Sequence, residues 1–151
     1  MEQNNIIRSY IKYVKDNHKD YISKISTFNE IFFLIELKFG VYIKSSSLII
    51  HNVNLYENNF GFNFVGDIRY LMPDGSRKQF KYFEFLFFPC EDHYHVDFLG
   101  FYHNDYVHYK LGVITMDELF NSIKKCNDNY FKTVYNFYLR GKKIDKLKEN
   151  I

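Results

Sequence analysis

The stretch FGFNFVGDIRYLMPDG, residues 60–75, decides the fold class of this chain. Aromatic and aliphatic residues alternate with small or polar ones from Phe60 to Tyr70, which is typical of a strand with one buried and one solvent-facing side. The turn sequence Met72–Ser76 follows at once. Its proline fixes one φ angle and its glycine supplies a positive one. The chain is therefore expected to fold back here as an antiparallel hairpin.

Neighbouring segments extend this hairpin into a larger sheet. Strands are expected over residues 48–56, 60–70, 77–88, 91–102 and 106–114, with a polar break at Lys44–Ser47 before them and Pro89 closing the third. The turns between them are short, which favours antiparallel neighbours in chain order. The first three strands are mainly apolar and are expected to form much of the core. The sequence thus predicts a five-stranded antiparallel β-meander over about residues 48–114.

The segments on either side of the sheet have the three- and four-residue apolar spacing of helices. Helices are expected at about residues 3–24 and 28–39 before the sheet, and at about 116–126 and 128–139 after it. Thr27 with Glu30, and Thr115 with Glu118, have the spacing of a capping box. Gly40 and Gly141 are expected to end helices, and the basic tail 142–151 is expected to fray. The prediction is a single α+β domain, residues 1–151, with two N-terminal and two C-terminal helices around the meander.

Composition narrows the function classes. The formal net charge is only +2, so a nucleic-acid partner is not expected. There is no apolar run of the ~20 residues that a membrane span requires, and the N-terminus lacks the pattern of a signal peptide. With two cysteines at most one disulfide is possible, and a cytoplasmic protein with reduced thiols is expected. The 17 phenylalanines and 14 tyrosines are consistent with AT-rich codons and carry no functional argument.

Charge is distributed unevenly along the chain. Glu91–Glu118 holds six acidic residues and one basic residue, whereas Leu119–Ile151 holds eight basic and three acidic ones. An acidic, tyrosine-bearing surface on the last two strands would suit a basic protein partner. The residues expected to bind that partner are Glu91, Asp92, Asp97, Tyr102, Asp105, Tyr106 and Tyr109.

His93, His95 and Asp97 form the sharpest local constellation. Residues at i, i+2 and i+4 of a strand project from one face, so two imidazoles and a carboxylate are candidates for one metal ion. The alternative is an ordinary solvent-facing strand, where histidines and carboxylates are common. His103 and His108 could join the other histidines in acid–base cleavage of RNA, but only Lys110 is near enough in the sequence to clamp a phosphate. A dyad of Cys90 and His93 is disfavoured because the neighbouring acids would raise the thiol pKa.

No nucleotide-binding or common hydrolase motif is present in the sequence, so no cofactor is expected and a binding protein is favoured over an enzyme. The preferred interpretation is a small inhibitor of the immunity-protein type, of the sort that bacteria encode, which covers the basic active site of a toxin or nuclease. One alternative is a metal-binding protein, or a small hydrolase or nuclease, using His93, His95 and Asp97. Another is a structural subunit that forms a homodimer through its Phe-rich strands.

Overall fold

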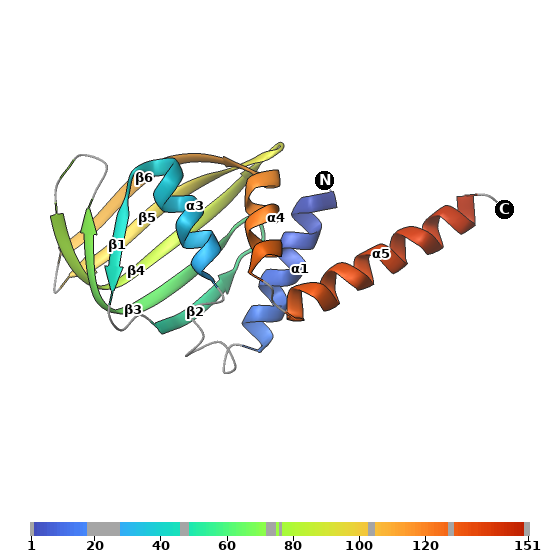
Figure 1. Cartoon of the computed structure of the whole chain (residues 1–151), viewed down its shortest axis with the longest axis horizontal. Helices are drawn as coiled ribbons and strands as arrows, with labels where there is room; N and C mark the ends of the chain where they lie inside the picture. The colour runs from blue at the N-terminus through green and yellow to red at the C-terminus, as the bar shows by residue number, and fades with distance from the viewer. Residues whose placement is uncertain are drawn as a thin grey trace.

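The fold is known from a computed structural model that describes residues 2–17, 28–45, 49–71, 75, 77–102, 105–126 and 129–149. A curved antiparallel sheet carries α3 across one face, while α1 and α4 lie side by side near one end of it and α5 leads away from the body (Figure 1). The elements in chain order are α1 (Glu2–Asp16), α3 (Asn29–Phe39), β1 (Tyr42–Ser45), β2 (Ile49–Leu55), β3 (Phe60–Leu71), β4 (Arg77–Cys90), β5 (His93–Tyr102), β6 (Asp105–Thr115), α4 (Met116–Lys125) and α5 (Asn129–Glu149).

The predicted α+β class and meander are confirmed. The expected strands are β2 to β6, each paired antiparallel with the next. The structure adds β1, which pairs with the second half of β3 from Tyr42↔Leu71 to Ser45↔Ile68. The last two residues of β1 fall in the polar break that was expected at Lys44–Ser47. Its partner is the part of β3 beyond the pairing with β2, where backbone groups would otherwise form an open edge. β1 and β2 thus follow one another along the same side of β3.

The core lies between the sheet and the helices, and phenylalanine dominates it. Alternate residues of β3, β4 and β5 are buried on this side of the sheet, which we call the covered face: Phe60, Phe62, Phe64, Phe83, Phe85, Phe87, Tyr94, Val96 and Phe98. Phe28, just before α3, and Phe32 within it pack on these rings, with centroids 5.0 Å apart for Phe28–Phe62 and 4.8 Å for Phe32–Phe64. The segment with the sequence IFFLIEL, which suits a buried strand as well as a helix, is therefore helical because its apolar side lies against the sheet.

Two helix ends agree with the sequence. Gly40 ends α3 with a φ of 65°, and the capping box of Thr115 and Glu118 opens α4. Thr27, the predicted cap of α3, lies outside the described residues; Phe28 occupies the N-cap position and makes no side-chain cap hydrogen bond. Residues 18–24 of the first predicted helix also lie outside them. None of the helices in the described ranges is both long and apolar enough to cross a membrane.

The predicted C-terminal ends of α5 and β4 are wrong. α5 does not stop at Gly141 but continues to Glu149, so residues 142–149 are helical rather than frayed. A single glycine costs only about 1 kcal/mol in a helix, and good helix formers flank this one.

β4 likewise runs through Pro89 to Cys90. In a two-residue hairpin the flanking pair, here Cys90↔His93, exchanges hydrogen bonds, so the next pair, Pro89↔Tyr94, does not. The Pro89 nitrogen therefore points toward β3, which begins only opposite Phe87, and the missing N–H breaks no ladder.

Candidate functional site

The face of the sheet that points away from the described helices carries the candidate site, and we call it the open face. Cross-strand pairing assigns residues to it, because directly opposed residues share a face. They include Gly61, Asn63 and Val65 of β3; Tyr82, Glu84, Leu86, Phe88 and Cys90 of β4; His93, His95, Asp97, Leu99 and Phe101 of β5; and Tyr106, His108, Lys110, Val113 and Thr115 of β6. This face therefore combines polar, titratable and aromatic side chains, in contrast to the opposite one.

One end of the open face brings three metal-binding side chains together. The β4–β5 turn contains only Glu91 and Asp92, so Cys90 lies directly across from His93, and His95 follows two residues later on the same face. One ligand atom from each of these three side chains lies within 4.8 Å of the other two. The two imidazole rings have centroids 5.1 Å apart. Cys90 is a free, exposed thiol, so the group is open to solvent.

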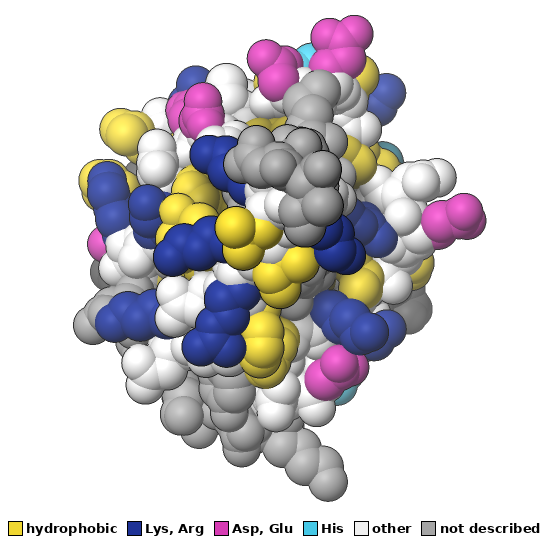
Figure 2. Space-filling model, turned by 90° about the vertical axis from the view of Figure 1, so that its right-hand side faces the viewer, with side chains coloured by type: hydrophobic (Ala, Val, Ile, Leu, Met, Phe, Trp, Pro, Cys, Tyr) yellow, Lys and Arg dark blue, Asp and Glu magenta, His cyan; other side chains and the backbone are white. Residues whose placement is uncertain are grey.

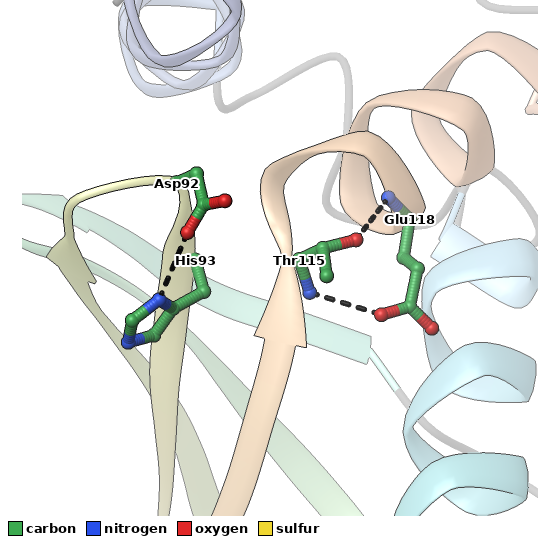
Figure 3. Close-up of polar contacts among 4 residues, drawn as sticks. All are labelled: Asp92, His93, Thr115 and Glu118. Carbon is green, nitrogen blue, oxygen red and sulfur yellow. Dashed lines mark hydrogen bonds and ion pairs between the residues drawn. The ribbon is translucent and has the colours of Figure 1, made fainter.

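The turn beside this group is fixed by the start of α4. The Met116 N–H donates to the Asp92 carbonyl oxygen at 2.9 Å, next to the Thr115–Glu118 capping box. The Asp92 carboxylate lies 3.2 Å from Nδ1 of His93 (Figure 3). Glu91 has a φ of 57° and, among the described residues, is the only non-glycine residue with a positive φ. The backbone around His93 is therefore held from two sides, by the sheet and by the helix.

Asp97, the third predicted metal ligand, is not part of that group. It lies four residues beyond His93, about 13 Å along an extended strand, whereas the cross-strand neighbour Cys90 is only about 5 Å away between Cα atoms. Its Oδ2 instead lies 2.8 Å from Nε2 of His108, and the residue is 9% exposed. Cys90 takes the place that the sequence pattern gave to the aspartate, because the hairpin register rather than the strand period brings the ligands together.

The predicted partner-binding acids do not form one continuous patch. Glu91 and Asp92 are exposed at one end of β5, and Asp105 is exposed at the other. β5 has ten residues, so these ends lie about 30 Å apart.

The predicted tyrosines separate as well. Tyr106 is exposed on the open face, whereas Tyr109 lies on the covered face against Phe98, with ring centroids 6.4 Å apart. The side chain of Tyr102 and all of His103 lie outside the described residues. Among the described side chains of the predicted surface, Asp105 and Tyr106 share the β5–β6 end but, as adjacent residues of one strand, project from opposite faces.

A half-buried carboxylate near the middle of the open face was not predicted. Glu84 accepts a hydrogen bond from Asn54 Nδ2 at 3.1 Å. The Asn63 amide, oriented to satisfy its neighbours, donates to Glu84 Oε2 at 2.8 Å and accepts from the Tyr82 hydroxyl at 2.7 Å. Burial raises the pKa of Glu84, while the bond from Asn54 works in the opposite direction. The pKa of Tyr82 is raised by burial and by the charge of Glu84.

Gly61 makes room for this carboxylate. A Cβ atom built there would lie 2.4 Å from Glu84 Oε1, closer than atoms in contact approach. In the sequence, Gly61, Asn63 and Glu84 look like ordinary solvent-facing positions of amphipathic strands. Only the register Asn63↔Glu84 reveals that they meet.

The end of the open face opposite to the cysteine carries adjoining aromatic rings, which we call the aromatic ladder. Ring centroids are 5.9 Å apart for His51–Tyr82, 5.4 Å for Tyr82–Phe101 and 5.1 Å for Phe101–Tyr106. Phe101 is 39% exposed and Tyr106 is 55% exposed. Large aromatic side chains that remain exposed as a group are typical of an interaction surface.

Comparison with known proteins adds no candidate, because no family model, curated protein or solved structure matches this chain. A functional proposal therefore rests on the geometry of the open face.

Proposed function

We propose that this protein binds another protein through the open face of its sheet, as a small inhibitor of the immunity-protein type. The observation that most directly supports this proposal is the aromatic ladder, in which Phe101 and Tyr106 are exposed on the strands of the sheet. Aromatic side chains anchor protein interfaces because they bury a large area while losing few rotamers. Strands β4 to β6 hold them in place before binding, so little ordering would be needed when the partner arrives.

The charges beside the ladder favour a basic partner, such as a toxin or nuclease. Two carboxylates, Glu84 and Asp97, lie on the open face beside the ladder, and Asp97 is already paired with His108. Burial raises the pKa of Glu84, so its charged form is poorly stabilised in the free protein. An arginine or lysine from a partner would favour that charged form. The carboxylate is therefore suited to recognise a cation at the interface.

The end of the molecule formed by α5 is poorly suited to bind a basic partner. Viewed along α5, lysine and arginine side chains gather around exposed apolar ones (Figure 2). The exposed residues of this helix include Arg140, Lys143, Lys146 and Lys148, together with Phe137 and Leu147. A basic protein would be repelled at this end of the molecule.

The test uses the product of the gene next to the one for this chain, if that product is a basic toxin or nuclease. Isothermal titration calorimetry is expected to show a one-to-one complex. The Phe101→Ala/Tyr106→Ala double variant should weaken it by about 100-fold, because both rings would be interface anchors. Phe137→Ala is the matched control: its ring is exposed on α5 and its loss should leave the affinity unchanged. No complex with wild type, unchanged affinity in the double variant, or an equal loss in the control would contradict the proposal.

A second candidate, the dimerising subunit, finds its support on α5 rather than on the strands. The Phe-rich face of the sheet is covered by helices, whereas Phe137, Ile144 and Leu147 are exposed with near-heptad spacing. Light scattering at high protein concentration tests whether the chain is such a dimerising subunit. A monomer rules out the dimerising subunit, and a dimer that Phe137→Ala disrupts would support it.

A further inference from the structure

We propose that Cys90, His93 and His95 form a zinc-binding site at the β4–β5 turn. The site is separate from the aromatic ladder and lies at the other end of β5, so it does not depend on the proposed protein–protein function. Three protein ligands leave a fourth coordination position. Since Cys90 and His95 are both exposed, that position faces solvent.

The distances fit one metal ion after small side-chain rotations. Ligand atoms on a single tetrahedral zinc, at ~2.0–2.3 Å from the metal, are about 3.5 Å from each other. Those of Cys90, His93 and His95 are all within 4.8 Å. Closing this difference requires a shift of about 1 Å between ligand atoms. The exposed side chains of Cys90 and His95 have room to make that movement.

The surroundings of His93 resemble those of a metal ligand. Metal-bound histidines almost always use their second ring nitrogen to bond a carboxylate or carbonyl, which fixes the ring. The Asp92 carboxylate lies 3.2 Å from Nδ1 of His93, so Nε2 is the nitrogen left for the metal (Figure 3). The Met116–Asp92 backbone bond holds this turn against α4. His93 would thus be the preorganised ligand to which Cys90 and His95 adjust.

The donor set selects the class of metal. A thiolate with two imidazoles suits zinc or another borderline-soft ion, whereas magnesium and calcium require oxygen ligands. Zinc would also keep the Cys90 sulfur deprotonated. The neighbouring acids, Glu91 and Asp92, add negative charge beside the ion, which favours a divalent cation. Water, or a side chain of a bound partner, would fill the fourth position.

Calorimetric titration of the whole reduced protein with Zn²⁺ tests the proposal. Wild type is expected to bind one ion per chain, and magnesium is expected not to bind. Cys90→Ser and His95→Ala should each weaken binding by at least about 10-fold, and Asp92→Asn by about 10-fold through its effect on His93. Cys126→Ser is the matched control, since Cys126 is the other free thiol and donates to the Ser122 carbonyl within α4.

Cobalt provides a readout that a general loss of folding cannot imitate. Co²⁺ bound to wild type should show thiolate-to-cobalt charge-transfer absorption, which Cys90→Ser should lose while circular dichroism shows an intact fold. Failure of wild type to bind Zn²⁺, or equal losses in Cys90→Ser and Cys126→Ser, would overturn the site. Either result would leave the binding assay with Phe101→Ala/Tyr106→Ala untouched, so the two proposals can fail separately.

Discussion

The two faces of the sheet are made by the same strands, but the covered face buries mainly apolar side chains whereas the open face buries polar side chains that are hydrogen-bonded. The covered face is mostly phenylalanine and other apolar side chains that pack against α1, α3 and α4, and its buried Tyr94 hydroxyl donates to Asn4 Oδ1 of α1. The open face also contains buried groups, Asn63 and Asp97, but each is hydrogen-bonded to a neighbouring side chain. Polar groups are costly to bury without partners. The difference indicates that one face provides stability and the other keeps polar chemistry close to the surface.

Removing one ring from the covered face should have the largest effect. Phe85 is 1% exposed and touches Phe32, Phe83 and Phe98. Phe85→Ala is expected to lower the free energy of unfolding by about 3–5 kcal/mol, because it removes buried area and leaves a cavity. Urea unfolding followed by circular dichroism measures the loss. Phe101→Ala, on the open face of the next strand, should lose far less; similar losses in both would contradict the assignment of the faces.

Disrupting the hydrogen bonds among Asn63, Glu84 and Tyr82 on the open face should have the second-largest effect on stability. Asn63→Ala removes one hydrogen-bond partner of Glu84, which keeps the bond from Asn54, and the partner of the Tyr82 hydroxyl. Losing a partner of a buried polar group costs about 1–3 kcal/mol. The same unfolding experiment measures it. Asn136→Ala, at an exposed position of α5, provides the control and should stay within about 0.5 kcal/mol of wild type. If the two variants behave alike, the cluster does not stabilise the fold.

The junction between the sheet and α4 should give a smaller effect. Thr115→Ala removes the side chain that accepts from the Glu118 N–H at 3.0 Å. Losing such a cap costs about 1 kcal/mol, which thermal unfolding can measure. Glu118→Gln should preserve most of the capping geometry and lose less. A larger loss in Glu118→Gln would indicate that the ion pair with Lys38, and not the cap, stabilises this junction.

The smallest expected effect is a dependence on pH. Burial raises the pKa of Glu84 above its unfolded value, so the protonated form is the one that the fold favours. Its contribution to stability is complete below the unfolded pKa and is lost as pH rises through the folded pKa. Glu84→Gln, which cannot ionise, should therefore gain stability relative to wild type between acidic and neutral pH. A relative loss over that range, measured by unfolding at several pH values, would contradict the raised pKa.

The sequence predicted several features that depend on a few adjacent residues, although the local signals of Gly141 and Pro89 did not end their elements. The alternation in β3, the capping box at Thr115 and the stop at Gly40 are local, and all three are confirmed. Features that depend on strand register were missed. β1 forms because β3 offers an unpaired edge, and Cys90 joins the histidines because the hairpin aligns it with His93. The contact between Asn63 and Glu84 likewise exists only once β3 and β4 are paired.

If the open face recognises a partner while the covered face holds the fold together, only the rings of the open face should respond to that partner. NMR spectra of protein with ¹³C-labelled Phe and Tyr rings would be recorded with and without the neighbouring gene product. We expect shifts in the ring signals of Tyr82, Phe101 and Tyr106, and none in those of Phe62, Phe64 and Phe85. Shifts confined to Phe137 on α5, or no shift in the aromatic ladder when the partner is saturating, would contradict this expectation.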